Sequence, residues 1–437
     1  MLYGFLSCAQ SELHTNKIAR NGTRISDTAR DTMAGGRAAP STLNPAASFV
    51  LAVTPPTPVV CTGSPEEIGR CQGDQLADKV RASQTMLDQL EAFRLAKPFG
   101  LPFFLYRWLA RRKAGSVWRG PLGARTPAMA ARIRGIADGA SARHDELQLL
   151  NLMEPILSDL RDFLRTGPPG AGCSAVAVRG SRSEGGRSVM VRNFDYLPLV
   201  QPFYALRELR PTSGYRALEF TVAPLAGAVD GINEKGLAIT NNYAYVTDTG
   251  DPSATLTMAT SMALAECATV TEAEGFLASQ KIWGGGILMV ADATGDIASL
   301  EISNTKRATH RPGDGEDLLL HTNRFREGPM RAVEIAGDAH YNDRAPTALR
   351  GLRIHDSSDS REAQLRRLLS GSNALSLDDL HRVMSDHGPG GQPSLDSVCM
   401  HSDYWSTTAC VHLLPVERKV RVAFNSACEA EFVEFAL

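Results

Sequence analysis

The sequence predicts an α+β protein in which a mainly helical part precedes a part rich in strands. Two long stretches between residues 65 and 157 carry apolar side chains at helical spacing. From residue 173 to the end, β-branched runs with glycine punctuation dominate, and two helical patterns interrupt them. Many strands with helices grouped between them indicate stacked sheets that are covered by helices.

The composition is that of an ordinary globular protein and excludes several classes. Of 437 residues, 43% are hydrophobic and 22% charged, and the net charge of −2 gives no reason to expect nucleic acid as a partner. No apolar run approaches the ~18–20 residues of a membrane span. We predict a cytoplasmic protein, with membrane contact an unfavoured alternative, and the cysteine pattern described next favours a reducing compartment.

The cysteines and histidines show no metal-like or disulfide-like spacing. The eight cysteines are scattered without a CxxC pair, which predicts neither a disulfide scaffold nor a structural zinc site. We predict no metal and no cofactor. The cysteines expected to be packed core thiols are Cys61, Cys71, Cys267, Cys399, Cys410 and Cys428.

The N-terminal part divides into a leader and a helical segment. Residues 1–47 are rich in Arg, Ser, Thr and Ala without periodicity, which predicts a disordered leader. Their opening, MLYGFLSCAQ, lacks the basic region and the apolar core of a secretory signal. One short strand, SFVLAV, and the helical runs then occupy residues 48–172.

A Pro/Gly-rich break, TGPPGAG at 166–172, runs directly into Cys173. If the chain stays whole, Cys173 is an ordinary buried thiol at the start of a strand. If the chain is cut after Gly172, Cys173 gains a free α-amine beside its thiol. The pKa values of an α-amine, ~7.7–8, and of a thiol, ~8.5, are close enough for the amine to act as the base.

A nucleophile of that kind needs a carboxylate to hold the α-ammonium and donors to stabilise an oxyanion. RNFD ends the strand that returns from Cys173 through a hairpin, so Arg192 and Asp195 are expected beside the thiol. Asparagines follow the turn NEKGL and the apolar run DLLL, although such residues also commonly bond neighbouring backbone. These candidates are Asn241, Asn242 and Asn323.

The order of these motifs resembles the superfamily of choloylglycine hydrolases and acyl-coenzyme A:6-aminopenicillanic acid acyltransferases, which are N-terminal-nucleophile (Ntn) hydrolases. The resemblance runs from about residue 58 to the end and includes TGSPEEIGRCQG, IRGIADGA, ILMVADATGDIASLEIS and DSVCMHSD. It implies a four-layer αββα sandwich made as a precursor. Residues 48–172 would be a helical pro-chain that stays bound, as a heterodimer, to the catalytic chain 173–437.

The resemblance also implies roles, residue by residue. Cys173 matches the nucleophile exposed by autocatalytic cleavage after Gly172, and Asp195 matches the carboxylate that holds its α-ammonium. The asparagine region is one residue shorter than in bile salt hydrolases, which leaves Asn241 as an alternative to Asn242. The remaining implied site residues are Arg192 near the thiol, Asn242 and Asn323 at the oxyanion hole, and Arg361 in DSREAQLRRLL as support. For Arg361, a solvated helix face is an equal alternative.

The implied activity is that of an enzyme that cleaves a linear amide C–N bond of an acylated small molecule through a thioester. An N-acyltransferase with acyl-coenzyme A as co-substrate would use the same residues. A third alternative is an uncleaved scaffold that binds an acyl ligand.

The segment KPFGLPFFLYRWLARRKAGSVWRG at 97–120 gathers aromatic and basic side chains. We favour a helix that packs its aromatic side against the catalytic layers. The alternatives are a lid or interfacial helix that contacts an acyl chain, or a basic end that holds a coenzyme A phosphate.

Overall fold

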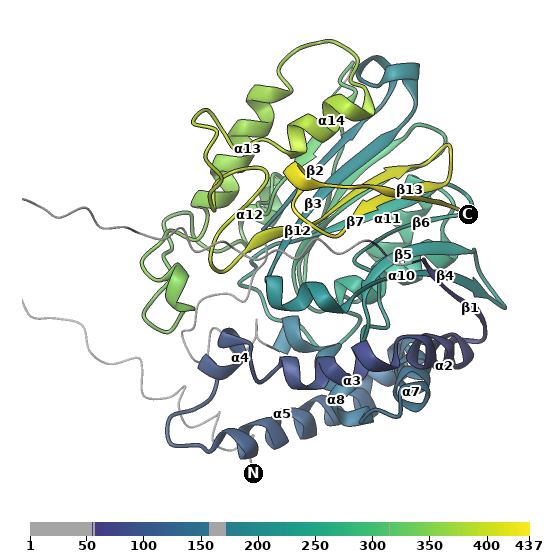
Figure 1. Ribbon diagram of the computed structural model, residues 1–437, viewed down its shortest axis with the longest axis vertical. Helices are drawn as coiled ribbons and strands as arrows, with labels where there is room; N and C mark the ends of the chain where they lie inside the picture. Colours follow the sequence, from purple (N-terminus) through teal and green to yellow (C-terminus); the bar gives the residue numbers. More distant parts are fainter. Residues whose placement is uncertain (1–54, 56, 157–171, 314) are drawn as a thin grey trace, which may run out of the picture. The chain divides into compact units, whose positions relative to one another are not determined.

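The computed structural model describes residues 55, 57–156, 172–313 and 315–437 (Figure 1). Contacts divide the chain into Met1–Ala47 and Ser48–Leu437, and the description below concerns the second unit. The predicted leader, the strand SFVLAV and the break at 166–171 lie outside the described residues. Within the described ranges, no helix combines the length and apolar character needed to cross a bilayer.

The larger sheet has eight strands in the order β1-β4-β5-β6-β7-β8-β9-β10. All neighbours are antiparallel except β1 and β4, which run parallel. Its central strands are buried at every position, which places them inside the molecule. The strands are β1 (Val59–Gly63), β4 (Tyr204–Pro211), β5 (Ala217–Val222), β6 (Asp230–Asn233), β7 (Ala238–Tyr243), β8 (Gly286–Ala291), β9 (Ile297–Ile302) and β10 (Arg307–His310).

The smaller sheet has six strands in the order β11-β2-β3-β12-β13-β14, all antiparallel. Strand β2 of this sheet contacts β7 and β8 of the larger one, so that the two sheets lie against each other. The strands are β11 (Leu318–His321), β2 (Gly172–Val178), β3 (Val189–Tyr196), β12 (Ser406–Leu414), β13 (Lys419–Ala423) and β14 (Val433–Ala436).

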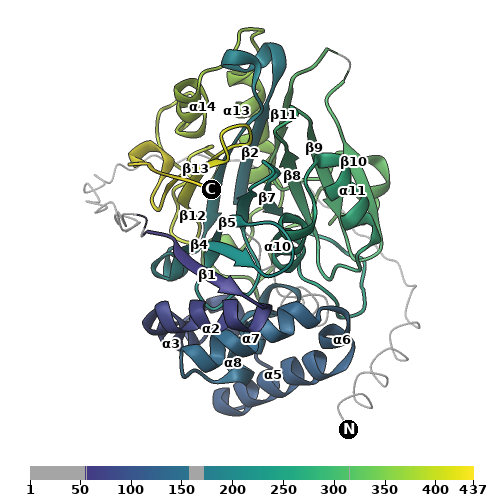
Figure 2. The same ribbon diagram turned by 90° about the vertical axis from the view of Figure 1, so that its right-hand side faces the viewer.

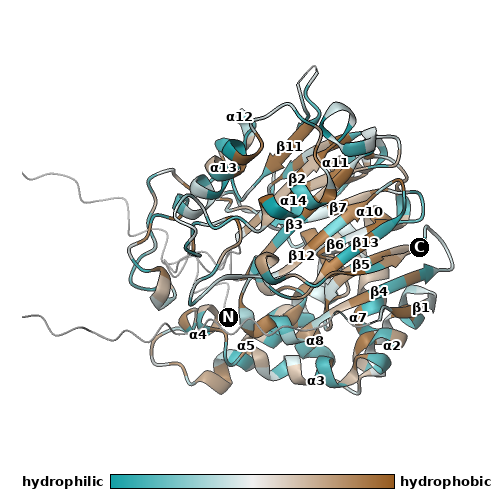
Figure 3. Ribbon diagram, turned by 45° about the horizontal axis from the view of Figure 1, so that its top comes forward, coloured by the Kyte–Doolittle hydropathy of each residue, from teal (hydrophilic) through white to brown (hydrophobic). Residues whose placement is uncertain are grey.

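Helices pack on both sheets. On the larger sheet, α10 (Leu256–Glu266) and α11 (Val270–Ser279) bury one apolar cluster. On the smaller sheet, α13 (Asp356–Leu368) and α14 (Leu377–Met384) bury another. A short helix, α12 (Gly328–Arg331), lies beside β10. The strands carry much of the hydrophobic colour in Figure 3. The predicted α+β fold with two sheets is confirmed.

The N-terminal helices gather at one end of the sheets, as Figure 2 shows. Ser64 and Glu67 form a capping box that fixes the start of the first of them. Helices α2 and α7 cross with their backbones in contact, which Gly69 and Gly135 permit because they have no side chain. A Cβ atom on either glycine would lie 2.1 Å from a carbonyl oxygen of the other helix. The helices are α2 (Pro65–Gln75), α3 (Ala77–Met86), α4 (Glu91–Leu95), α5 (Phe103–Val117), α6 (Gly123–Arg125), α7 (Pro127–Gly139) and α8 (His144–Leu150).

The aromatic helix α5 packs mainly on α8 and α4, whereas we expected it against the catalytic layers. The rings of Tyr106 and Phe93 lie 4.9 Å apart between centroids. Arg107 Nη2 and Arg111 Nη1 bind Glu146 at 2.8 and 3.1 Å, so these two cations are engaged within the protein. The exposed aromatic residues of the segment are Phe99, Phe104 and Trp108.

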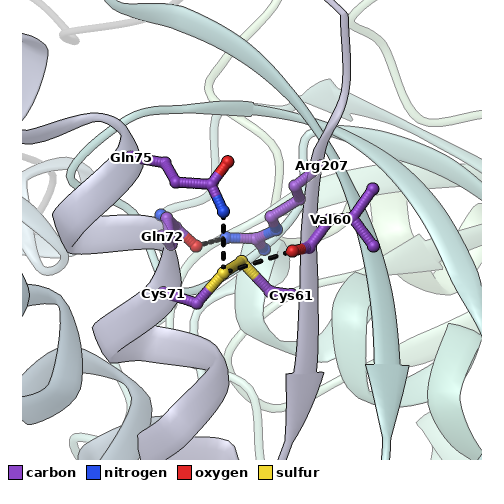
Figure 4. Close-up of a disulfide and its surroundings, with 6 residues drawn as sticks. All are labelled: Val60, Cys61, Cys71, Gln72, Gln75 and Arg207. Carbon is purple, nitrogen blue, oxygen red and sulfur yellow. Dashed lines mark hydrogen bonds between the residues drawn. A yellow bond between two sulfur atoms is a disulfide. The ribbon is translucent and has the colours of Figure 1, made fainter.

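Cys61 on β1 and Cys71 on α2 form a disulfide, with their Cα atoms 5.6 Å apart (Figure 4). The prediction that both are packed core thiols is wrong. Helix α2 begins two residues after β1 ends and packs against it. This brings the two sulfur atoms together, although a separation of ten residues is not a recognised disulfide motif. Because disulfides persist in oxidising environments, the bond weighs against the predicted cytoplasmic, reducing compartment, which stays a prediction.

Candidate active site

Cys173 lines a cavity between the N-terminal helices and the ends of the strands. The walls are mostly apolar, with a few polar groups that converge on the thiol, which is the usual composition of a small-molecule site. Apolar lining residues include Leu87, Leu150, Met153, Phe194, Val222 and Tyr243. Polar lining residues include Asn151, Glu154, Arg192, Asn241, Thr255 and Thr257.

The pairing of β2 with β3 places the predicted hairpin residues. Gly172 lies opposite Asp195, and Cys173 lies opposite Phe194. Arg192 lies two positions further along, on the same face of the sheet as the thiol, because directly opposed residues share a face. The expected return of Arg192 and Asp195 to Cys173 is therefore what the structure shows.

The Arg192 guanidinium is fully buried and directed at the thiol. Its Nη2 lies 3.0 Å from Cys173 Sγ. Its other contacts are Asp230 Oδ2 at 2.8 Å, Asn241 O at 2.5 Å and Asn242 Oδ1 at 3.3 Å. Burial raises the pKa of the Cys173 thiol, and the positive charge of Arg192 acts in the opposite direction. The arginine thus favours the thiolate at a site that otherwise disfavours charge.

Asp195 is a buried carboxyl, and the structure shows a hydrogen bond to only one of its two oxygen atoms among the described residues. Its Oδ1 accepts a hydrogen bond from Thr407 Oγ1 at 2.6 Å. Its Oδ2 has no hydrogen-bond partner among the described residues, and Arg361 Nη1 lies 3.7 Å from it. Burial raises the pKa of Asp195 to about 6, with Arg361 opposing the shift. A nearby cation would stabilise the ionised form of this carboxyl, which burial disfavours.

Arg361 reaches from α13 to the backbone around the thiol. Its Nη1 donates to Cys173 O at 2.6 Å and to Ser174 Oγ at 3.0 Å, and its Nη2 donates to Asn323 Oδ1 at 2.8 Å. The side chain is only 1% exposed. The alternative of a solvated helix face is therefore wrong, and the arginine holds the strand that carries Cys173.

Asn323 receives the backbone N–H of Cys173, since its Oδ1 accepts that bond at 2.9 Å. Its Nδ2 donates to Tyr243 O at 2.8 Å. Asn242 lies deeper, where its Nδ2 donates to Thr322 O at 3.0 Å and to His321 O at 3.3 Å. Both hydrogens of the Asn242 amide thus have acceptors within the protein.

Asn241 differs from its neighbour because alternation along β7 turns its side chain into the cavity. Among the described residues, no hydrogen-bond partner for the Asn241 side chain is found, and only its backbone groups are engaged. The structure thus brings all six predicted site residues together. Of the two adjacent asparagines, however, Asn241 has the free amide at the cavity.

A family model described as acyl-coenzyme A:6-aminopenicillanic acid acyl-transferase matches residues 181–427, more than half of the chain. The chain belongs to this family. The predicted resemblance is confirmed at the level of the family. The match begins after Cys173, so it covers neither the thiol nor the N-terminal helices. A search of the curated proteins found no match.

Several solved structures match part of this chain. The N-acylethanolamine-hydrolyzing acid amidase ortholog of Caenorhabditis elegans is 13% identical, with 61% of this chain and 100% of that chain covered and a TM-score of 0.40. The conjugated bile acid hydrolase of Clostridium perfringens is 13% identical, with 61% of this chain and 97% of that chain covered and a TM-score of 0.38. The penicillin V acylase of Agrobacterium tumefaciens is 15% identical, with 61% of this chain and 86% of that chain covered and a TM-score of 0.37.

The sequence analysis missed two acidic residues that lie near Arg192 in the structure. Asp230 pairs with Arg192, and its only sequence signal is its place just before the turn NEKGL. Glu154 comes from the helical part and lines the cavity. Burial raises the pKa of Glu154 to about 7, with Arg192 opposing the shift. A single acid in the apolar run NLMEPIL, just before the Pro/Gly break, could have drawn notice.

Proposed function

We propose that the protein is an autoprocessing Ntn cysteine amidohydrolase that cleaves a linear amide bond of an acylated small molecule. Its helices and sheets would form the four-layer αββα sandwich of that superfamily. Residues 48–172 would be the pro-chain and 173–437 the catalytic chain, associated as a heterodimer after cleavage. The observation that carries this proposal is the surroundings of Cys173. Arg192 lies on its sulfur, Asn323 accepts from its nitrogen, and Asp195 Oδ2 is buried with no hydrogen-bond partner among the described residues.

Self-cleavage would begin with loss of the thiol proton and attack of Cys173 Sγ on the carbonyl carbon of Gly172. The C–N bond between the two residues breaks, and its nitrogen takes up a proton to become an α-amine. The Gly172 carbonyl is then held as a thioester on Sγ. Water hydrolyses that thioester and leaves a Gly172 carboxylate and a free thiol.

The packing at Gly172 supports cleavage at this bond. A Cβ atom at this position would lie 2.5 Å from Met400 Cε and 3.1 Å from Asp195 Cβ. Glycine therefore lets the backbone lie close to the carboxyl without displacing the end of the Met400 side chain or crowding Asp195.

In the processed enzyme, the new α-ammonium of Cys173 would pair with Oδ2 of Asp195. The amine, in its neutral form, would accept the thiol proton as Sγ attacks the substrate carbonyl. The amide of Asn241 and the second hydrogen of Asn323 Nδ2 would stabilise the oxyanion. The leaving amine takes the proton, and water then hydrolyses the thioester of the acyl-enzyme.

An acyl-coenzyme A-dependent N-acyltransferase is the second candidate, and the family description favours it. An amine in place of water would resolve the same thioester, with acyl-coenzyme A as donor. Incubation with acyl-coenzyme A, with and without a primary amine, separates the two. Transferase activity predicts an N-acyl product in preference to free acid.

The proposal is tested by intact mass spectrometry of the purified protein beside Cys173→Ala. We expect wild type to give two chains, one of which begins at Cys173, and the variant to stay whole. A folded wild type that remains a single chain after prolonged incubation would contradict autoprocessing and favour the scaffold alternative. Cleavage of an acyl p-nitroanilide by wild type alone would support the amidase activity.

A further inference from the structure

Four potential metal ligands meet at one place away from the cavity. They are His387 after α14, Cys399 and His401 before β12, and Cys428 in the turn Ala427–Glu429. One ligand atom from each residue lies within 4.8 Å of those of the other three. His401 Nε2 lies 3.4 Å from Cys399 Sγ and 3.5 Å from Cys428 Sγ.

We propose that these four residues bind a structural zinc ion. Two cysteines and two histidines form the ligand set of closed, tetrahedral zinc sites. With Zn–S and Zn–N bonds of about 2.3 and 2.0 Å, the ligand atoms of a tetrahedron stand roughly 3.3–3.8 Å apart. The two sulfur-to-nitrogen distances fall within that range. Four ligands leave no open position, which makes the role structural and not catalytic.

The exposure of the four ligands leaves the site accessible to a metal ion from solvent. Cys399 is buried, the two histidines are partly buried, and Cys428 is exposed. The sequence analysis predicted no zinc because the cysteines form no CxxC pair and the histidines have no metal-like spacing. The four positions span 42 residues. They converge because the loop after α14, the segment before β12 and the turn after β13 meet at one end of the smaller sheet.

The zinc site would order a loop that needs support. Residues 385–405 contain no helix and no named strand, and loops of this length without secondary structure are uncommon in compact domains. Three of the four ligands lie in this loop. Two of them, Cys399 and His401, flank Met400, whose backbone N–H donates to Thr407 Oγ1 at 2.8 Å. The same hydroxyl donates to Asp195 Oδ1. The metal would therefore fix the wall behind the cleavage site.

A second group of His381, Cys410 and His412 offers a comparison within the same sheet. Only three ligand atoms meet there among the described residues. The rings of His381 and His412 pack on Phe432, with centroids 5.2 and 4.3 Å away. These side chains are accounted for by packing, so Cys410 is the matched control for the proposed ligands.

Protein purified without chelator and assayed by elemental mass spectrometry should contain one zinc ion per chain. The double variant Cys399→Ser/Cys428→Ser should lose it, while Cys410→Ser should keep it. A chelator should lower the Tm of wild type and of Cys410→Ser, with little effect on the double variant. Wild type without stoichiometric zinc, or zinc that persists in the double variant, would overturn the proposal.

Alkylation under native conditions distinguishes the metal from a Cys399–Cys428 disulfide. For a zinc site, iodoacetamide should label both cysteines after chelator is added, without reductant. Labelling that requires reductant and ignores chelator would show a disulfide and overturn the proposal. Both readouts are independent of the proposed amidase activity, because they require neither cleavage at Gly172 nor a substrate.

Discussion

Two fully buried arginines, Arg192 and Arg207, are used in different ways. Each pairs with a buried carboxylate: Arg192 with Asp230 at 2.8 Å, and Arg207 with Glu219 at 2.6 Å. Every described contact of Arg207 is an oxygen, including Gln72 of α2, so this arginine ties a helix to the larger sheet. Arg192 instead directs one donor at the sulfur of Cys173.

The difference shows how a functional buried charge can be told from a structural one. A neutral thiol is a weak acceptor, so a buried guanidinium gains little from it compared with a carbonyl oxygen. The gain becomes large once the sulfur is ionised. The fold alone explains Arg207, whereas the position of Arg192 suits a thiolate on Cys173, the form that attacks in the proposed reaction.

The largest expected effect is on stability, in Arg207→Met. The substitution leaves the Glu219 carboxylate buried without its partner, and we expect a loss of about 3–5 kcal/mol in the free energy of unfolding. Chemical denaturation measures it. Adding Glu219→Met should recover a large part of the loss, because no unpaired charge then remains. A loss below about 1 kcal/mol in Arg207→Met would contradict the structural role.

Arg192→Lys should act on chemistry more than on folding. An ammonium keeps the charge but cannot reach Asp230, the backbone of Asn241 and the thiol together. We expect the rate of self-cleavage to fall about 10²–10³-fold, the size typical of a lost preorganised donor. Time-resolved intact mass spectra measure this rate. An unchanged rate together with a lower Tm would make Arg192 as structural as Arg207.

Asp195 should make the uncleaved precursor sensitive to pH. Its pKa is about 6 in the folded chain and ~3.9 when unfolded, so the folded state binds the proton more tightly. Stability should therefore fall as the pH rises from about 4 to about 6, by at most about 3 kcal/mol. Comparing the Tm of Cys173→Ala with that of Cys173→Ala/Asp195→Asn isolates this group. Parallel curves for the two variants would refute the assignment.

The two adjacent asparagines should differ in kind. Asn241→Ala removes an amide that faces the cavity, and we expect kcat to fall roughly tenfold to a hundredfold, the value of one hydrogen bond to a charged group. Asn242→Ala should mainly lower stability, because it removes bonds to the carbonyls of His321 and Thr322. Kinetics with an acyl p-nitroanilide, together with Tm values, separate the two. The reverse pattern would restore Asn242 as the oxyanion donor.

Local patterns were sufficient to predict the α+β fold and the hairpin at the site. The alternation of β-branched residues indicated strands, and the short return from Cys173 to RNFD indicated that Arg192 and Asp195 lie beside it. The helical period also identified most of the N-terminal helices. These features depend on residues that are close in sequence, for which local rules hold.

Features that depend on distant packing were not predicted. Whether Asn241 or Asn242 faces the cavity depends on the register of β7 against β8, which no local motif sets. Asp230 and Glu154 acquire their roles only where separate elements meet around Arg192. The Cys61–Cys71 bond depends on how α2 folds back on β1. In each case, the residue that decides the outcome lies outside the local sequence motif.

Strand β1 has a consequence for how the two proposed chains would hold together. It pairs in parallel with β4 through five residue pairs, from Val59 with Arg207 to Gly63 with Pro211. After cleavage at Gly172, this would be an intermolecular ladder, in which one polypeptide completes the sheet of the other. Separation would then leave a bare sheet edge, a surface that promotes aggregation. The released catalytic chain should therefore precipitate and not circulate as a free subunit.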